Sequence, residues 1–206
     1  MRTRVKICGI TNLIDAETAL KSGADALGFI FVPDTPRYIT PDNASEIITE
    51  LPPFIATVGV FRNSEQTEVQ AIALECGITS IQLHGSETPE YCNQLSLPVI
   101  KVIELQSEND LQSIEKYTVN ALLVDKPKAI STGTINLELA KKARTYTNRL
   151  ILAGGLTPNN VADAIRCVKP YAVDVASGVE AEKRRKDPDK ISAFMQAVSE
   201  IDRQLY

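Results

Sequence analysis

Short runs of β-branched and apolar residues alternate along this 206-residue chain with amphipathic stretches that carry charge on one side, and the alternation occurs eight times. The apolar runs predict strands, and the amphipathic stretches predict helices. Strand and helix in regular succession favour right-handed crossovers and a parallel sheet. Eight units share the 206 residues, about 26 each, which leaves little room for insertions. We therefore expect an α/β fold, a single compact (β/α)8 TIM barrel with eight parallel strands.

The expected strands are short, and each precedes an expected helix. We expect strands over Thr3–Cys8, Ala26–Phe31, Ile55–Phe61, Ser80–Leu83, Val99–Ile103, Ala121–Asp125, Leu150–Ala153 and Ala172–Ala176. We expect helices over Leu13–Ser22, Pro41–Leu51, Glu65–Glu75, Pro89–Leu95, Asn109–Lys116, Leu137–Tyr146, Pro158–Val168 and Asp189–Leu205. The clearest helix starts are Thr40-Pro41, Thr157-Pro158 and Asp187-Pro188, because Thr and Asp cap helices and Pro suits the first turn. The fifth helical pattern is the weakest, and it also fits an irregular loop.

The chain shows no linker or low-complexity tract, so we expect residues 1–206 to form one domain. The only charge cluster, Glu182–Asp187, is interpreted as a solvated loop. The longest apolar stretch, Ala26–Val32, is far shorter than the roughly 18 residues of a membrane span, and the first residues do not resemble a signal peptide. We therefore expect a cytoplasmic protein.

The formal net charge is −4, from 22 basic and 26 acidic residues. This balance gives no electrostatic reason to expect a nucleic acid or a membrane surface as a partner. The four cysteines are scattered singly, without metal-ligand spacing, and we predict neither a zinc site nor a disulfide framework. Cys76, Cys92 and Cys167 fall in or beside helical patterns and are expected to be packing residues.

Glycines follow the last two expected strands, where barrels of this type often bind phosphate through backbone amides. Gly154 and Gly155 follow the seventh strand, and Ser177 and Gly178 follow the eighth. One such loop alone is more simply explained as a tight turn. The pair of loops together predicts a site for a phosphorylated small molecule.

Cys8 and Asp125 end the first and sixth expected strands, at the face where such barrels place catalytic groups. Because side chains alternate along a strand, Lys6 and Cys8 are expected inside the barrel, with Asp174 as the inward partner of Lys6. A nearby cation would lower the pKa of the Cys8 thiol. A thiol and a carboxyl around a bound phosphosugar suggest a base and an acid.

Three further polar residues are candidates for substrate binding. Arg37 lies in the long loop after the second strand, where its guanidinium could bind a carboxylate, although a surface arginine is an equally good explanation. Gln82 and His84 end the fourth strand. A single histidine at a strand end is more often a hydrogen-bonded structural residue than a catalytic one.

The sequence resembles the phosphoribosylanthranilate isomerase family of tryptophan biosynthesis over nearly its whole length. The motifs that carry the resemblance are Lys6-Ile-Cys-Gly-Ile-Thr-Asn12, Gly23-Ala-Asp-Ala-Leu-Gly-Phe29, Pro36-Arg-Tyr38, Val58-Gly-Val-Phe61, Gln82-Leu-His-Gly85, Gly154-Gly-Leu156 and Val173-Asp-Val-Ala-Ser-Gly-Val-Glu180. The resemblance implies an Amadori rearrangement of N-(5′-phosphoribosyl)anthranilate without metal or organic cofactor. It implies Asp125 as the acid, Cys8 as the base, Arg37 at the anthranilate carboxylate, and the backbone of Gly154, Gly155, Ser177 and Gly178 at the phosphate.

One loop departs from the family pattern. Asp125 is followed by Lys-Pro-Lys-Ala-Ile-Ser-Thr-Gly133, where the family usually has a glycine-rich loop that leads to Phe-Asp-Trp. This loop leaves open a binding protein for a phosphosugar that has lost turnover. A second alternative, a phosphosugar isomerase of the histidine-pathway type, is similar at the two phosphate loops but is expected to have an aspartate in place of Cys8. Monomer and homodimer are both compatible with the sequence.

Overall fold

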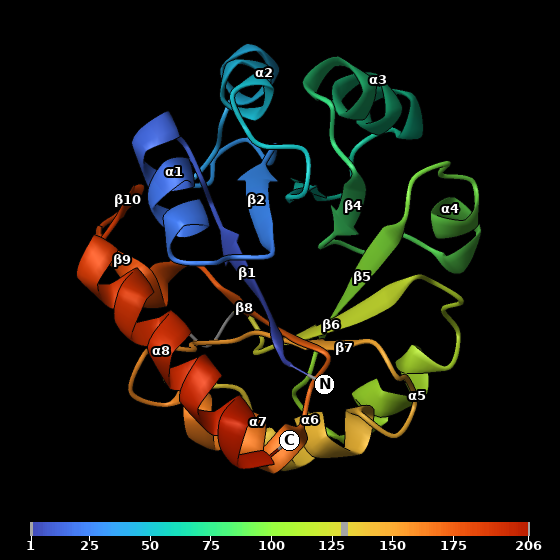
Figure 1. Cartoon of the computed structure of the whole chain (residues 1–206). Coiled ribbons are helices and arrows are strands. Elements are labelled where there is room, and N and C mark those ends of the chain that lie inside the picture. Colours follow the sequence, from blue (N-terminus) through green and yellow to red (C-terminus); the bar gives the residue numbers. More distant parts are fainter. Residues whose placement is uncertain (1, 129–131, 206) are drawn as a thin grey trace.

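The computed structural model describes residues 2–128 and 132–205. Eight parallel strands, hydrogen-bonded in sequence order, form a closed barrel in which β8 pairs with β1 (Figure 1). The barrel strands are β1 Arg4–Cys8, β2 Ala26–Ile30, β3 Ala56–Phe61, β4 Ser80–Leu83, β5 Val99–Glu104, β6 Ala121–Asp125, β7 Leu150–Leu152 and β8 Ala172–Val175. The expected barrel is confirmed, and every strand boundary lies within one residue of its predicted position.

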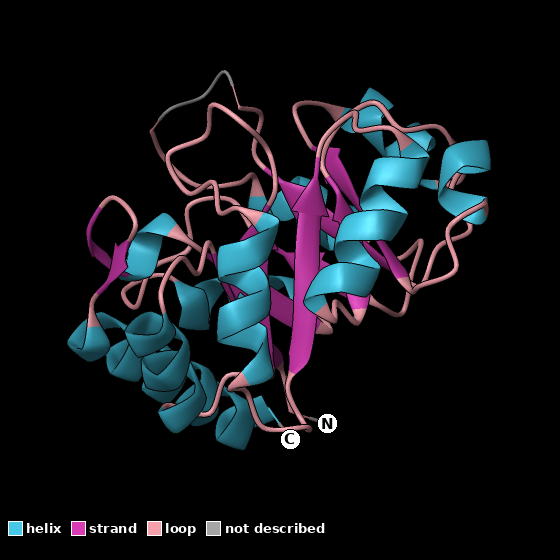
Figure 2. Cartoon of the chain, turned by 90° about the horizontal axis from the view of Figure 1, so that it is seen from above, coloured by secondary structure: helices cyan, strands magenta, loops and turns pink. Residues whose placement is uncertain are grey.

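The helices lie on the outside of the barrel (Figure 2). They are α1 Leu13–Lys21, α2 Pro41–Thr49, α3 Gln66–Cys76, α4 Pro89–Asn93, α5 Leu111–Ile114, α6 Leu137–Ala143, α7 Val161–Val168 and α8 Pro188–Leu205, with a 3₁₀ turn η1 at Glu108–Asp110 before α5. Among the described residues, none of these helices combines the length and the apolar character that a bilayer span requires.

Three helices are at least three residues shorter than predicted. The sixth ends at Ala143 instead of Tyr146. The fifth is shorter than expected, because a 3₁₀ turn capped by Ser107 precedes a four-residue helix. The seventh starts at Val161 instead of Pro158, because residues 157–160 form a turn. In that turn the Asn160 amide donates to the Thr157 carbonyl at 3.2 Å, and the Asn160 side chain accepts from the Thr157 amide at 2.8 Å. The Thr-Pro pair at residues 157–158 therefore opens a turn, whereas Thr40-Pro41 and Asp187-Pro188 open helices.

Alternation along the strands separates two apolar clusters. The inner one fills the barrel and consists of Val58, Ile100, Val102, Ala121, Leu123, Ile151, Ala153 and Ala172. The larger outer one lies between the strands and the helices, and it contains Val5 and Ile7 of β1. Lys6 and Cys8 consequently point into the barrel, as expected.

A short antiparallel hairpin, β9 Glu180–Glu182 and β10 Arg185–Lys186, connects β8 to α8 after the 3₁₀ turn η2, Ser177–Val179. The sequence interpretation of this charged run as a solvated loop is wrong for its last lysine. Residues 181–185 are exposed, but the Lys186 side chain is fully buried. The hairpin turns this lysine inward, toward the ends of β1 and β8.

Both termini lie at the end of the barrel where the strands begin (Figure 2). The Thr3 amide donates to the Asp202 carboxylate at 2.6 Å, which fastens the end of α8 to the start of β1.

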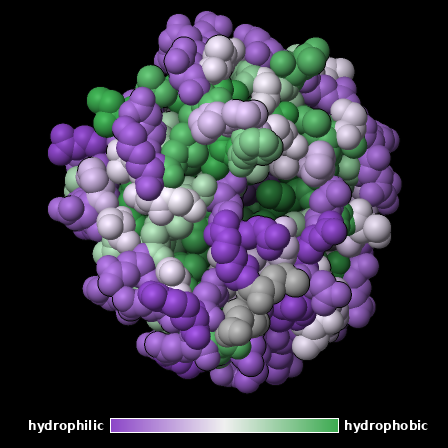
Figure 3. Space-filling model, in the orientation of Figure 1, coloured by the Kyte–Doolittle hydropathy of each residue, from purple (hydrophilic) through white to green (hydrophobic). Residues whose placement is uncertain are grey.

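A cavity of about 560 Å³ opens at this face, bordered by Arg4, Val58 and Tyr171 among others. Figure 3 shows the face, with a hydrophobic floor inside a hydrophilic rim. Phe54, in the loop before β3, is 98% exposed.

Candidate active site

Cys8 ends β1 with its side chain inside the barrel and 5% exposed. The neighbouring Lys6 ammonium donates to Asp174 Oδ1 on β8 at 2.9 Å, so the predicted inward pair is confirmed. Burial raises the pKa of the Cys8 thiol, and Asp174 adds to this effect, whereas Lys6 and Lys186 oppose it. The resting group at neutral pH is therefore the thiol and not the thiolate.

The space around the thiol depends on a glycine of the next strand. Gly28 of β2 pairs in register with Cys8. A Cβ atom at Gly28 would lie 2.7 Å from Cys8 Sγ, closer than real Cβ contacts, and a tight 3.0 Å from Lys6 Nζ. The absence of a side chain at Gly28 is therefore what allows both polar groups to lie inside the barrel.

Asp125 ends β6, three strands away from β1 around the closed barrel. Its Oδ1 accepts from the Lys126 amide at 2.7 Å, and its side chain is 24% exposed. Burial raises the pKa of Asp125 to about 6, with smaller contributions from the charges of Asp174 and Glu104. A carboxyl with this pKa carries a proton far more often near neutral pH than an ordinary aspartate, as a general acid must.

His84 follows β4 and lies beside Asp125. Its Nε2 is 3.9 Å from Asp125 and 3.8 Å from Glu104. Burial, with Lys128 and other cations, lowers the pKa of His84 to about 3, so the ring is neutral and these contacts are not ion pairs. His84 Nε2 and Gln82 Oε1 are buried, and neither has a hydrogen-bond partner within the described residues. Both predicted binding residues thus have polar atoms left for a ligand.

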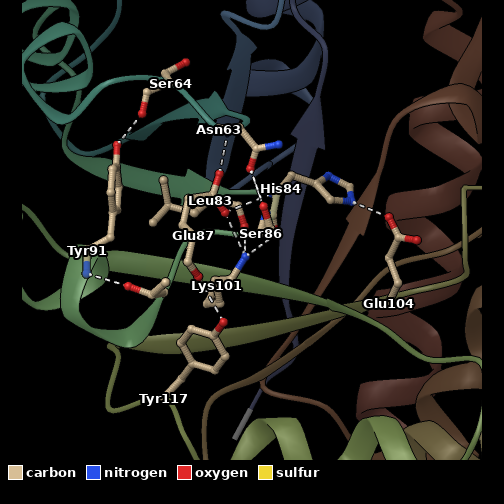
Figure 4. A network of polar contacts seen from close by, with 12 residues as sticks. Asn63, Ser64, Leu83, His84, Ser86, Glu87, Tyr91, Lys101, Glu104 and Tyr117 are labelled. Atoms are coloured by element: carbon tan, nitrogen blue, oxygen red, sulfur yellow. Dashed lines mark hydrogen bonds and ion pairs between the residues drawn. The ribbon is translucent and has the colours of Figure 1, made fainter.

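A buried ion pair supports the loop that carries His84 (Figure 4). Lys101 Nζ on β5 binds Glu87 at 2.8 Å, and each side chain is 2% exposed. The same ammonium donates to the Gly85 carbonyl at 2.7 Å, and Glu87 accepts from the amides of Gly85 and Asn63 at 2.9 and 2.8 Å. The Lys101–Glu87 pair therefore provides hydrogen-bond partners for backbone groups of the β4–α4 loop.

Arg37 forms a two-pronged ion pair with a carboxylate of this chain. Its Nε and Nη2 each donate to Glu180 at 2.6 Å, and the hydrogen bond to Glu180 raises the pKa of Arg37. Glu180 occupies one edge of the guanidinium, which leaves the Nη1 edge for a second anion. The arginine side chain is 20% exposed and is held in one orientation.

The two predicted phosphate loops pack closely against their neighbours. Gly154 and Gly155 have φ of +93° and +76°, and within the described residues their amides donate to no acceptor. A Cβ at Gly154 would lie 3.0 Å from Asp125 Oδ1, and one at Gly178 would lie 1.8 Å from the Leu156 carbonyl oxygen. The glycines therefore bring the β7 loop close to Asp125 and to the η2 turn that holds Ser177.

The loop after Asp125, which departs from the family pattern, contacts the β4 and β5 ends. Lys128 Nζ donates to the His84 carbonyl at 3.0 Å and lies 3.7 Å from Glu104. Lys126 Nζ donates to the Gly133 carbonyl at 3.0 Å. Residues 129–131 lie outside the described residues.

Glu180, Lys186 and the Lys101–Glu87 pair were not identified from the sequence. Glu180 lay inside a recognised motif, and its acidic side chain next to the phosphate loop was an available signal. Lys186 lay in a charged run, where nothing local distinguishes a buried lysine from a solvated one. Within the described residues, no group of three or more His, Cys, Asp or Glu side chains is arranged to hold a metal ion.

Comparison with known proteins identifies the relatives of the chain. The family model described as N-(5′-phosphoribosyl)anthranilate (PRA) isomerase matches residues 5–197. A protein from Trichlorobacter lovleyi, named N-(5′-phosphoribosyl)anthranilate isomerase, is 45% identical over 201 residues, which cover 96% of this chain and 98% of the relative.

Solved structures give the same result. A phosphoribosyl anthranilate isomerase in complex with reduced 1-(o-carboxyphenylamino)-1-deoxyribulose 5-phosphate has a TM-score of 0.90 at 41% identity, covering 96% of this chain and 99% of that one. Monomers derived from the dimeric isomerase of Thermotoga maritima have a TM-score of 0.90 at 40% identity, with the same coverage.

Proposed function

Because the chain belongs to the N-(5′-phosphoribosyl)anthranilate isomerase family, we propose that it catalyses the Amadori rearrangement of N-(5′-phosphoribosyl)anthranilate to 1-(2-carboxyphenylamino)-1-deoxyribulose 5-phosphate in tryptophan biosynthesis. The single observation that supports the acid–base assignment is Asp125, whose pKa of about 6 suits a proton donor, at the same end of the barrel as the buried Cys8 thiol. The relatives favour this activity over the histidine-pathway type of isomerase.

The reaction needs two proton transfers. Asp125 protonates the furanose ring oxygen, the bond from that oxygen to C1′ breaks, and the anilino nitrogen lone pair forms a C=N bond. Cys8 then removes the C2′ proton, and the released electron pair forms the C1′=C2′ bond of the enol while the nitrogen regains its lone pair. One proton leaves Asp125 and one arrives at Cys8, so the step balances without a cofactor, and we propose none.

The protonation states of the two groups are coupled through this cycle. The raised pKa of Cys8 and the pKa of about 6 at Asp125 put a thiol and a carboxylate in the resting protein at neutral pH. The reactive arrangement holds the same number of protons, with the proton on Asp125 and the charge on sulfur. It is therefore a minor tautomer whose fraction stays constant between the two pKa values.

Substrate binding uses the remaining predicted residues. Arg37 binds the anthranilate carboxylate through its Nη1 edge, and the amides of Gly154, Gly155, Ser177 and Gly178 bind the phosphate. Gln82 and His84 contact the substrate through their unpartnered atoms, Oε1 and Nε2, which is supported by their burial.

The remaining parts of the proposal concern partners and location. We propose one barrel domain over residues 1–206, a cytoplasmic location, and no nucleic-acid or membrane partner. The protein is a monomer or a homodimer, and Phe54, which is 98% exposed in the loop before β3, favours the homodimer, because such a ring is stabilised by burial. Analytical ultracentrifugation of the wild type and Phe54→Asp distinguishes the two states.

The test follows the loss of anthranilate fluorescence when the purified protein meets freshly made N-(5′-phosphoribosyl)anthranilate. We expect rapid turnover by the wild type and a decrease in kcat of about 10²–10⁴-fold in Cys8→Ala and in Asp125→Asn. Cys167→Ala and Asp163→Asn are matched controls on α7 and are expected to behave as wild type. Wild-type kcat in either site variant would refute that residue's assignment.

A second arm separates binding from turnover. Arg37→Ala is expected to raise KM about tenfold or more, because a charge-assisted hydrogen bond to the carboxylate is lost. Its control is Arg203→Ala on α8. Tight binding of the reduced product analogue without any turnover would identify a binding protein instead of an enzyme.

A further inference from the structure

Lys186 is the buried end of an otherwise exposed run of charges. Its ammonium donates to the Cys8 carbonyl at 2.7 Å, to the Ala176 carbonyl at 3.0 Å and to Glu180 Oε1 at 3.2 Å. An ammonium has three donors, so all of them are in use. Lys186 therefore has no donor left for a substrate, and any effect on the reaction must pass through these three partners.

Each partner belongs to a different part of the proposed site. The Cys8 carbonyl belongs to the proposed base itself. The Ala176 carbonyl directly precedes Ser177 and Gly178, whose amides we propose to bind the phosphate. Glu180 holds the Arg37 guanidinium by two bonds of 2.6 Å. A single ammonium thus contacts the base, the phosphate loop and the support of the carboxylate-binding arginine.

The lysine is itself held from both sides. Its amide donates to Asp15 Oδ2 on α1 at 2.9 Å, in a buried hydrogen bond. The charged groups next to the ammonium are Glu180 and Arg37, and the neutral Cys8 thiol is also close. Lys186 and Arg37 share the carboxylate of Glu180, so a change at Lys186 alters the partner that holds Arg37.

We propose that Lys186 is a positioning residue of the isomerase, which holds Cys8, the Ser177–Gly178 turn and Arg37 in their reactive arrangement without touching the substrate. This inference rests on the proposed function. Displacing a reacting group by about 1 Å can lower the rate about 10²-fold, so a contact remote from the chemistry is sufficient for a large effect.

The experiment compares Lys186→Met with Lys183→Met. Methionine nearly keeps the length of the side chain and removes the charge and the donors, and the control removes an exposed lysine of the same hairpin. We expect Lys186→Met to lower kcat/KM about 10²-fold through both a lower kcat and a higher KM. We expect its Kd for reduced 1-(o-carboxyphenylamino)-1-deoxyribulose 5-phosphate to rise about tenfold, and the control to match the wild type.

A merely structural role has a different signature. It would lower the melting temperature and leave kcat, KM and Kd of the folded variant unchanged, which would overturn the proposal. Combining Lys186→Met with Arg37→Ala gives a further check. Because part of the affinity loss passes through Glu180 and Arg37, it should shrink in the Arg37→Ala background. An equal loss in both backgrounds would refute the connection through Glu180.

Two provisions keep the outcome decisive. If Lys186→Met does not fold, Glu180→Gln carries the test, because it keeps the shape and removes the charge that both cations share. An unchanged Kd and kcat/KM in Glu180→Gln would then overturn the proposal. If the wild type binds the analogue without turnover, the proposed activity is refuted. The role of Lys186 is then tested by comparing the Kd of Lys186→Met for the analogue with that of the wild type. If the wild type neither turns over nor binds, both proposals fail.

Discussion

Glu104 of β5 and Asp125 of β6 end neighbouring strands in direct register, so two carboxylates share one edge of the barrel mouth. His84 lies within 4 Å of both, at 3.8 and 3.9 Å. Because His84 is neutral, it adds no positive charge that would favour ionisation of Asp125. Asp125 therefore stays protonated to a higher pH than an aspartate in solvent. Its ionisation in the folded protein lowers the free energy of unfolding.

We predict that Asp125→Asn stabilises the fold above pH 7 and not at pH 4. The folded state binds the Asp125 proton up to a pKa of about 6, whereas the unfolded chain releases it near pH 4. Wild-type stability therefore falls as pH rises through this window, by about 1–3 kcal/mol in total, and the amide does not titrate. Urea unfolding of both proteins between pH 4 and 8 measures the difference. A difference that does not change with pH would show that the carboxyl titrates normally.

The pH dependence of kcat/KM tests the coupled protonation of Cys8 and Asp125. We expect a plateau from about pH 7 to pH 8.5, because the fraction of the reactive tautomer is constant there, and a decline only above the ordinary thiol range. The substrate phosphate titrates near pH 6, outside this window. A rate that instead climbs continuously through pH 9 would show that only the thiolate is required and that Asp125 need not carry a proton.

The interior of the barrel was predictable because it follows from alternation. Knowing that Lys6 and Cys8 share a face, and that β8 closes on β1, was sufficient to pair Lys6 with Asp174, and the pair has that geometry. The same reasoning placed Cys8 and Asp125 at the strand ends. Both cases depend only on local periodicity and on the closure of the barrel.

The burial of Lys186 was not predictable, because it depends on acceptors far away in the sequence. The Cys8 carbonyl is 178 residues away, and it is available only because the hairpin folds over the end of β1. Similarly, Pro158 looked like a helix start, but Asn160 satisfies the local amides in a turn instead. Polar groups whose partners are set by tertiary structure carry no distinctive local pattern.

Gly28→Ala should damage the reaction more than the fold. The added methyl would lie 2.7 Å from Cys8 Sγ, so the thiol must move. We expect a stability loss of about 1–3 kcal/mol from overpacking, and a decrease in kcat of about tenfold or more from the displaced base.

Gly59→Ala on β3 is the matched control for Gly28→Ala. Its methyl would lie 2.8 Å from the Phe61 ring, away from the thiol. We expect a comparable loss of stability with kcat close to wild type. Equal kcat losses in the two variants would show that strain in the barrel, and not the position of Cys8, controls the rate.

Lys101→Met should be strongly destabilising, because it leaves Glu87 buried without its cation. Removing one partner of a buried ion pair costs about 3–5 kcal/mol, and the Lys101–Glu87 pair is 2% exposed on both sides. Lys142→Met is the control, since the Lys142–Glu108 pair lies on the surface and such pairs contribute less than about 1 kcal/mol. Thermal and urea unfolding at pH 7 compare the two variants.

Adding Glu87→Gln to Lys101→Met should recover part of the lost stability, because the unpaired charge is then removed. If Lys101→Met costs no more than the control, the β4–α4 loop and His84 do not depend on this pair for their position.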